Sequence, residues 1–226
     1  MILKLVKEML RGKSIGRILT NLKIKERDIV LSGKVLDLGG RNLHWIDGQP
    51  RGESYMRFMR FENVEILRLN IDETTGPDHL IDFEKEKLPF QDNSVDSVLL
   101  FNLLEHIYNF NFLTKQVFRV LKDRGILVGS VPFLKKIHPD PHDFFRYSNQ
   151  ALRRVFEEAG FSKIKIETIG FGPFVNQYSQ IEFIFPKLIR IILFFFSFSV
   201  DWIVLRLKPI LKGRFPLSYL FIIQKS

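Results

Sequence analysis

From residue 32 onward, short apolar runs typical of strands alternate with stretches whose apolar residues recur at helical spacing. This alternation limits the fold more than any other pattern in the sequence. It predicts an α/β, Rossmann-like doubly wound domain, with a mostly parallel sheet and helices on both faces. A Ser32-Gly33 turn precedes the first strand, and the seven predicted strands lie at 34–38, 64–71, 79–81, 97–101, 126–131, 163–169 and 219–224.

Two helices are marked by their end signals. The first covers 111–121 and is followed by Gly125. The second begins after Ser148, a residue type suited to an N-cap, and ends at Gly160. Its apolar face consists of Leu152, Val155, Phe156 and Ala159. We predict a single domain made of a segment at 1–31, a core at 32–170, an apolar insert at 171–215 and the last strand at 216–226.

Glycines and polar residues follow the predicted strands where each one ends. In an open parallel sheet ligands bind beyond these ends, at the point where the strand order reverses. Gly39 and Gly40 allow a ligand to approach the backbone, and an acid after the second strand, such as Asp72, can accept hydrogen bonds from both hydroxyls of a ribose. The other candidates at strand ends are Asp37, Asn70, Asp82, Phe83 and Asn102. The set predicts a nucleoside-type pocket.

The glycines do not match a dinucleotide site. Such a site needs G-x-G-x-x-G and an acid about 20 residues later, whereas Gly39 is followed by Arg41 and Asn42, and Asp72 lies 33 positions on. The sequence also lacks the Lys-Ser/Thr pair of a phosphate-cradling loop. A nucleoside without phosphates fits better.

Charge is concentrated at the two ends of the sequence. Residues 1–34 and 186–226 each carry a net charge of +6, and the part between them carries −3. Basic ends rich in Leu, Ile and Phe favour an anionic membrane surface over nucleic acid. The absence of cysteine excludes a disulfide scaffold, a Cys-ligated metal and a thiol nucleophile.

The N-terminal segment has a basic amphipathic pattern. Ile2, Leu5, Val6 and Met9 fall on one helical face. This helix either packs on the domain, which we favour slightly, or anchors the protein at a membrane interface.

The insert contains an apolar stretch at 181–205. Its longest uncharged run, 191–200, has ten residues, about half the length of a membrane-spanning helix. A single crossing would also separate the last strand from its sheet. We therefore expect the insert to lie on the bilayer, to pack against a partner or to cover the substrate pocket. Phe194, Phe195 and Phe196 are the expected membrane contacts.

Three segments carry a family resemblance. "VLDLGG", "IDFEKEKLPFQDNSVDSVLLFNLLEHI" and "VFRVLKDRGILVGSVPF" resemble the class I S-adenosylmethionine-dependent methyltransferases of the type 11 kind, over residues 34 to 169. The later "HPDPHDFFRYSNQALRRVFEEAGF" looks like a subgroup met in the modification of surface polysaccharides or lipids.

The resemblance implies S-adenosylmethionine as cofactor and a role for each matching residue. Asp37, Gly39 and Gly40 would form the loop beneath the methionine part and the ribose. Asp72 or Asn70 would hold the ribose hydroxyls. In the same scheme the adenine would meet Asp82 and Phe83, and the methionine side would meet Asn102.

One departure from the family falls in the glycine loop. The family places three alternating glycines after the acid, and here only Gly39 keeps its place. Arg41 and Leu43 occupy the other two positions, while Gly40 fills a position that is usually something else. The geometry of this loop is therefore open.

The loop after the fifth strand carries two histidines. Pro139 and Pro141 exclude a helix, so the spacing of helical metal pairs is unavailable and no metal is expected. A histidine near neutral pKa can take a proton from an acceptor hydroxyl. We predict His138 or His142 as general base, oriented by Asp143.

The same loop offers contacts to the acceptor. Arg146 is predicted to steer an anionic group, and Tyr147 to touch the substrate. The alternative is a loop hydrogen-bonded to itself by Asp143, Arg146 and Tyr147. His106 is expected to pack at a helix start, and Asp96 to cap the turn before the fourth strand.

These patterns together predict a methyltransferase, with methylation of oxygen on a lipid-linked glycan or a similar amphipathic small molecule. The alternatives are methylation of a quinone-type lipid, and a membrane-associated assembly protein with a silent cofactor fold. The expected place is the cytoplasm, with peripheral binding to the inner face of the membrane.

Overall fold

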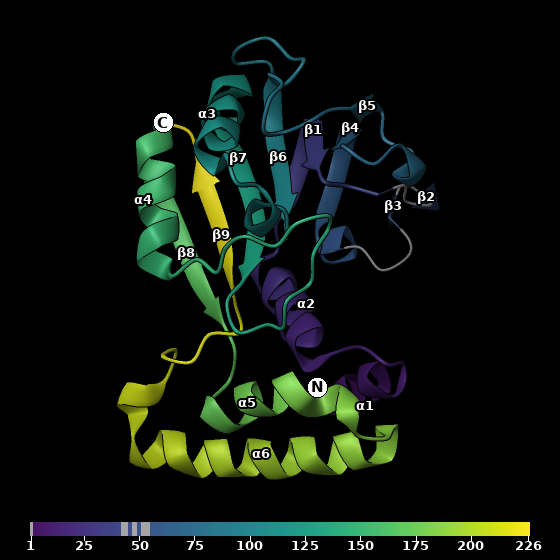
Figure 1. Cartoon of the computed structure of the whole chain (residues 1–226), viewed down its shortest axis with the longest axis vertical. Helices are drawn as coiled ribbons and strands as arrows, with labels where there is room; N and C mark the ends of the chain where they lie inside the picture. Colours follow the sequence, from purple (N-terminus) through teal and green to yellow (C-terminus); the bar gives the residue numbers. More distant parts are fainter. Residues whose placement is uncertain (1, 42–44, 47–48, 51–54) are drawn as a thin grey trace.

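The chain folds around one seven-stranded sheet in the order β5-β4-β1-β6-β7-β9-β8 (Figure 1). The computed structural model describes residues 2–41, 45–46, 49–50 and 55–226. The sheet strands are β1 (Val30–Leu38), β4 (Arg60–Asn70), β5 (His79–Leu80), β6 (Val95–Phe101), β7 (Leu121–Pro132), β8 (Lys163–Ile169) and β9 (Ser218–Gln224). β9 pairs antiparallel with β7 and β8, and the other pairs are parallel. β2 (Trp45–Ile46) and β3 (Gln49–Pro50) form a separate antiparallel pair. The predicted α/β architecture is confirmed.

Helices cover both faces of the sheet. One core cluster joins the sheet to α3 (Phe110–Val120) and α4 (Asn149–Ala159). A second joins it to α2 (Ile15–Arg27) and the short helix η1 (Tyr55–Phe58). The end signals of α4 act as predicted, since the Ser148 hydroxyl accepts from the Ala151 N–H at 3.2 Å and Gly160 has a φ of 112°.

The strand order reverses beside β1. The chain runs from β1 to β4 and β5 on one side, and then to β6 and β7 on the other. Crossovers therefore leave β1 in opposite directions, and a crevice opens between the carboxyl ends of β1 and β6. This is where the strand-end residues gather.

A helical platform lies across the carboxyl ends of the parallel strands (Figure 1). It consists of α1 (Ile2–Leu10), α5 (Pro173–Ile181), η4 (Glu182–Ile184), α6 (Lys187–Leu207) and η5 (Pro209–Leu211). Met9 of α1 packs with Ile15, Val175 and Phe194 in a third core cluster. The N-terminal helix thus packs on the domain, the reading favoured from the sequence.

Helix α6 is bound to the domain through its charged residues. It is long and apolar enough to cross a membrane by length and composition. Yet both carboxylate oxygens of the fully buried Asp201 accept backbone N–H groups in the first turn of α5, from Phe174 at 3.0 Å and Val175 at 2.7 Å. Arg190 is also buried and pairs with Glu182 of η4 at 3.1 Å. The charges that shorten the apolar run therefore dock α6 on the domain.

The prediction of a turn at Ser32-Gly33 before the first strand is wrong. Ser32-Gly33 lies inside β1, which begins at Val30, and the pairing with β4 shifts register there. Gly33 has a φ of 71°, and a Cβ at this position would lie 2.4 Å from the Asp96 carboxylate. Asp96 accepts the Lys34 N–H at 2.8 Å and pairs with Lys122 at 2.8 Å. Asp96 therefore holds the bulge of β1 in place and does not cap a turn.

Candidate active site

The two glycines after β1 form a closely packed loop. Gly39 has a φ of 75°, and its N–H donates to the Leu69 carbonyl of β4 at 2.8 Å. A Cβ on Gly40 would lie 2.2 Å from Oδ2 of Asp37. Position 40 therefore needs glycine because the Asp37 carboxylate packs against its backbone. This contact accounts for the departure from the family's glycine pattern at this position.

Asp37 is buried at the carboxyl end of β1. Its exposed fraction is 8%. Burial raises its pKa to about 7, and the positive charge of Arg68 opposes the rise only in part. The carboxyl group can therefore change its charge near neutral pH.

The two candidates for the ribose point to different neighbours. The Asn70 amide donates to the Gly40 carbonyl at 3.1 Å, and its oxygen accepts the Asp72 N–H at 3.1 Å. The Asp72 carboxylate caps η2 (Glu73–Thr75) and accepts from the N–H and hydroxyl of Thr74, which lowers its pKa. Asn70 is thus the one held against the glycine loop.

The next strand end carries the predicted adenine residues. Asp82 pairs with Lys85 at 2.9 Å and accepts the Glu84 N–H at 3.0 Å, and these contacts, led by Lys85, lower its pKa. Phe83 is buried in the main core cluster. Asp82 follows the end of β5 with its carboxylate at the surface, whereas the Phe83 side chain packs in the core.

Asn102 is fixed at the end of β6 by two hydrogen bonds. Its amide donates to the Tyr55 hydroxyl at 2.9 Å, and its oxygen accepts from the Ser130 hydroxyl at 3.0 Å. Tyr55 in turn stacks on Phe101 at 4.9 Å and carries the Arg17 guanidinium 3.6 Å from its ring centre. Sequence analysis missed Tyr55, because it belongs to no motif and does not follow a strand.

The set fits a nucleoside-type cofactor. Asp82, Asn70, Asp37 and Asn102 follow or end β5, β4, β1 and β6, which are consecutive in the sheet. The glycine pair lies between them, with the Leu103 side chain packed against Gly39 and Asp37 against Gly40. One edge of the sheet thus offers carboxylates, amides and glycine backbone side by side, as hydroxyl and amine recognition requires.

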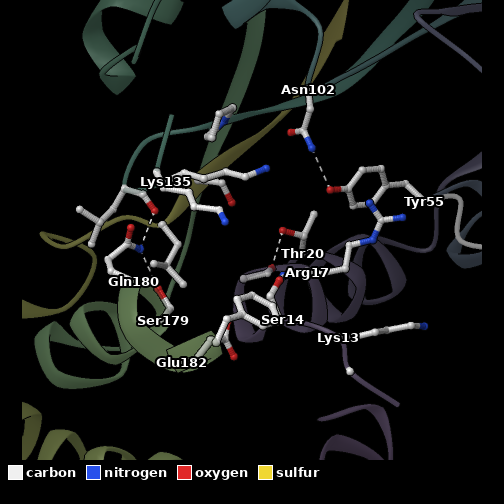
Figure 2. A pocket seen from close by; sticks show the side chains of 18 of the residues that line it. Lys13, Ser14, Arg17, Thr20, Tyr55, Asn102, Lys135, Ser179, Gln180 and Glu182 are labelled. Carbon is white, nitrogen blue, oxygen red and sulfur yellow. Dashed lines mark hydrogen bonds between the residues drawn. The ribbon is translucent and has the colours of Figure 1, made fainter. Parts of the chain in front are cut away.

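A cavity of about 730 Å³ adjoins this edge and shares Asn102 with it (Figure 2). It lies between the ends of β6 and β7, the start of α2, and α5 with η4. Its charged lining residues are Arg11, Lys13, Arg17, Lys135, Lys136 and Glu182. The Glu182 carboxylate is already engaged by the Ile15 N–H and by Arg190. Arg11 and Lys13 pair with Glu8 at 2.8 and 2.6 Å, so Arg17, Lys135 and Lys136 give the described lining its positive character.

Lys135 extends into this cavity opposite Tyr55 (Figure 2). Burial among the surrounding residues lowers its pKa, and Arg146 and Arg17 add to that effect, while Glu105 and Asp143 oppose it. An anion beside the ammonium would favour its charged form. The arrangement suits the binding of an anionic group.

The loop after β7 is tied together by Asp143. Its carboxylate makes a two-point ion pair with Arg146, at 2.5 and 2.7 Å, and accepts the His138 N–H at 2.8 Å. The Arg146 guanidinium holds the pKa of Asp143 well below its usual range. Tyr147 is buried and donates to the Leu104 carbonyl at 3.2 Å. Asp143, Arg146 and Tyr147 therefore hold this loop in place; contacts of Arg146 and Tyr147 with an acceptor stay predictions.

The two histidines of the loop have different surroundings. Nδ1 of His138 lies 3.3 Å from the Asp143 carboxylate, and its Nε2 turns toward Glu105 at 3.5 Å. The His142 side chain is exposed and packs on Phe144. Neither histidine is among the described residues that line the cavity. Of the two, His138 is the one that Asp143 orients, and its role as base stays a prediction.

Arg41, at one of the missing glycine positions, pairs with Asp140 at 3.1 Å. Both side chains are exposed, so the pair contributes little stability. It nevertheless links the glycine loop to the histidine loop. Leu43, at the other position, lies outside the described residues.

Replacing Asp37 by Asn should stabilise the protein at alkaline pH. The unfolded carboxyl has a pKa of 3.8 and the folded one about 7, so the unfolded state loses its proton first and stability falls as pH rises between these values. One pKa unit corresponds to about 1.4 kcal/mol, which sets a ceiling of about 4 kcal/mol. We expect a gain of about 1–3 kcal/mol at pH 8, measured by urea unfolding.

The gain should widen from about pH 4 to pH 7 and then level off. Asp123→Asn, at an exposed acid, serves as the control and should show no such widening. A gain from Asp37→Asn that does not change with pH would mean that Asp37 ionises normally in the folded protein.

Residues 60–129 match the family described as "Methyltransferase domain". The match covers β4 to β7, and so includes Asn70, Asp72, Asp82, Phe83 and Asn102 but not the glycine loop. No curated protein matches the chain.

Solved structures show the same fold at low identity. A SAM-dependent methyltransferase from Archaeoglobus fulgidus is 18% identical, with a TM-score of 0.57 over 92% of this chain and 94% of that one. Phosphoethanolamine N-methyltransferase 2 from Haemonchus contortus, solved with S-adenosyl-L-methionine, is 14% identical, with a TM-score of 0.54 over 91% and 52%. The [4+2]-cyclase SpnF is 16% identical, with a TM-score of 0.58 over 93% and 81%.

Proposed function

Since the chain belongs to the class I S-adenosylmethionine-dependent methyltransferases, we propose that it methylates an oxygen of an anionic, amphipathic acceptor, such as a lipid-linked glycan. The proposal rests on the cationic cavity. This cavity adjoins the edge of the sheet where Asp82, Asn70, Asp37 and Asn102 lie, which we call the cofactor edge.

Five of the cavity's described lining residues are Lys or Arg, and two of these, Arg11 and Lys13, pair with Glu8. The one acid in the described lining, Glu182, pairs with Arg190. An acceptor with a phosphate or carboxylate fits such a site.

The apolar part of the acceptor is inferred from the rim of the cavity. Phe183 and Ile184 of η4 line the cavity and are also exposed on the surface. They lead directly into α6, whose outer face is apolar. A molecule with its charged head in the cavity can therefore keep a hydrocarbon tail along η4 and α6.

The alternatives are less consistent with this cavity. A quinone-type lipid has no anionic group to use the lysines and arginines. A phosphate-bearing acceptor is also named for the Haemonchus contortus structure, although its 14% identity supports only the fold. A silent cofactor fold would leave Asp37 and the glycine loop without a ligand, and calorimetry with S-adenosylhomocysteine tests this directly.

Bound S-adenosylmethionine supplies a methyl group on a positive sulfur, ready for in-line displacement by the acceptor oxygen. The task of the chain is to position the two reactants. The glycine loop, Asn70 and Asp82 would hold the cofactor, and Asn102 would separate it from the acceptor cavity. Lys135 and its neighbours would fix the anionic group, so that an acceptor hydroxyl faces the methyl. His138 is proposed as the base that takes the hydroxyl proton.

We place the protein in the cytoplasm, bound to the inner face of the membrane through α6. The outer face of α6 is apolar, and cations lie near both of its ends, at Lys187, Arg206 and Lys208. Such a helix suits the headgroup region of an anionic leaflet. This position would bring a lipid-linked acceptor to the cavity rim.

Replacing Lys135 and Lys136 by Met should raise the KM for the acceptor about 10–100-fold. One lost charge-assisted hydrogen bond to the acceptor costs about 1.5–3 kcal/mol, so the expected rise corresponds to the loss of one such bond. The assay measures transfer of radiolabelled methyl to membrane extract and to a phosphate-bearing lipid-linked glycan. Lys115→Met on α3, at an exposed lysine outside the cavity, is the control.

Affinity for S-adenosylhomocysteine should stay the same in all these proteins, because none of the changed residues lies at the cofactor edge. Methylation of a neutral quinone in preference to the anionic acceptor, with no effect of the lysine change, would exclude the proposed acceptor class.

A further inference from the structure

Three side chains converge beside the cavity, where the helix η3 (Leu104–His106) meets the histidine loop. Glu105 and His106 come from η3, directly after β6, and His138 comes from the loop. One ligand atom from each lies within 4.8 Å of the other two. Glu105 and His106 are buried and His138 is partly buried.

Glu105 is short of partners. Its exposed fraction is 0%, and neither carboxylate oxygen accepts a hydrogen bond. Nε2 of His138 is also buried without a hydrogen-bond partner. A buried carboxylate in this state is strongly unfavourable unless a positive species lies against it.

The outer nitrogens of both imidazoles are engaged by acceptors. Nδ1 of His106 lies 2.5 Å from the His142 carbonyl. Nδ1 of His138 lies 3.2 Å from the Lys136 carbonyl and 3.3 Å from the Asp143 carboxylate. A carbonyl or carboxylate favours a proton on Nδ1. At His138 these two acceptors lie closer to Nδ1 than the donor Nη2 of Arg146, at 3.5 Å, so we assign the lone pair of each neutral ring to Nε2. Both Nε2 atoms then face Glu105 with lone pairs, an arrangement found in histidines that bind metals.

The distances suit one small cation. Oε1 of Glu105 lies 3.7 Å from Nε2 of His106 and 3.5 Å from Nε2 of His138. Two ligands of a tetrahedral zinc, each about 2.1 Å from the ion, lie about 3.4 Å apart. We propose that Glu105, His106 and His138 bind a divalent transition-metal ion, of which Zn²⁺ fits best, with a fourth position left for water.

Two basic side chains, Lys135 and Arg146, lie near the cluster. Lys135 and Arg146 are close enough to Glu105 to feel its charge. Arg146 is compensated by its two-point pair with Asp143. The ion therefore competes mainly with Lys135, whose side chain extends into the cavity.

Such an ion would connect the end of β6 to the loop after β7. The loop already contacts η3 through the Phe144 and Phe145 N–H groups, which donate to the Glu105 carbonyl. A metal at the side chains would fix the same contact more rigidly and stabilise the fold. Because the ion would occupy Nε2 of His138, a chain with the metal bound could not use His138 as the base proposed for methyl transfer, so the two roles exclude each other. The inference does not depend on methyl transfer.

The test measures Zn²⁺ binding to the tag-free full chain after removal of metals. Competition with a chromophoric chelator gives stoichiometry and affinity, and Co²⁺ reports tetrahedral nitrogen and oxygen ligation in its visible spectrum. We expect one ion per chain, with binding at least 100-fold weaker in Glu105→Gln and His138→Ala. His142→Ala, in the same loop but outside the cluster, should bind as tightly as the native chain.

Thermal unfolding provides a second readout. Saturating Zn²⁺ should raise the Tm of the native chain and of His142→Ala, and leave that of His138→Ala unchanged. His138 is on a partly exposed loop, so this variant is expected to fold. If the folded native chain binds no stoichiometric ion, the cluster is instead neutralised by protons on the histidines and the proposal fails. Equal Zn²⁺ affinity in native and His138→Ala would likewise overturn it.

Discussion

Replacing Ile192, Phe196 and Ile203 together by serine should release the protein from anionic membranes, lowering its vesicle affinity about 10³-fold or more. These side chains are 68%, 65% and 52% exposed, and they continue the stripe begun by Leu188 on the outer face of α6. Full burial of an apolar side chain of this size contributes about 1.5–3 kcal/mol. Co-sedimentation with vesicles containing an anionic lipid measures the loss.

The variant is chosen to leave the fold intact. The trio expected from the sequence, Phe194 to Phe196, is unsuitable because Phe194 is only 4% exposed and packs in the third core cluster. The control carries Ile71→Ser and Leu80→Ser, at exposed positions near the β5 edge of the sheet. It should bind vesicles like the native chain.

Salt separates the two contributions to this binding. Cations near the end of α6, at Arg206, Lys208, Lys212 and Arg214, attract an anionic leaflet by about 1 kcal/mol each, and salt screens them. Native binding should therefore weaken with salt without vanishing. If the folded triple variant still sediments with vesicles as well as the native chain, the outer face of α6 serves a protein partner instead.

Replacing His138 by Ala should lower kcat for methyl transfer about 10²–10⁴-fold, the usual contribution of a positioned general base. Affinity for S-adenosylhomocysteine should be nearly unchanged, since His138 lies outside the cofactor edge. Single-turnover transfer and calorimetry on the same protein measure the two quantities.

Two further variants separate a base from a metal ligand. If His138 is the base, Asp143→Asn, which removes the carboxylate beside Nδ1, should lower kcat and shift its pH profile, while His106→Ala should matter little. If His138 holds an ion with Glu105 and His106, then His106→Ala should lower both Zn²⁺ affinity and kcat. Full turnover in His138→Ala would mean that the loop is structural and that catalysis is positioning alone.

The sheet and its cofactor edge were predictable from local patterns. Strands such as β8 were placed correctly because burial and turn residues mark them within a few positions of the chain. Asp37, Asn70 and Asn102 could be assigned to one edge because parallel strands bring their carboxyl ends together. The errors at Ser32-Gly33 and Asp96 share a cause, since a bulge looks like a turn when the strand paired with it is unknown.

The cationic cavity and the buried Glu105, His106 and His138 cluster were not predictable in this way. The cavity is lined by α2, η1, β7 and α5, whose separation along the chain hides their proximity. Glu105 was visible only as a residue after a strand, and nothing local shows that His138, 33 positions later, reaches it. The buried face of α6 likewise depends on Asp201 meeting the start of α5, a tertiary contact.

The place of β9 in the sheet has a consequence for biosynthesis. β8 finds its only sheet partner among the described residues in β9, and β9 follows α6 in the chain. During translation α6 therefore leaves the ribosome before the sheet that anchors the platform can close. Closure of the sheet thus waits for β9, the last of its strands in chain order, which must pair with both β7 and β8.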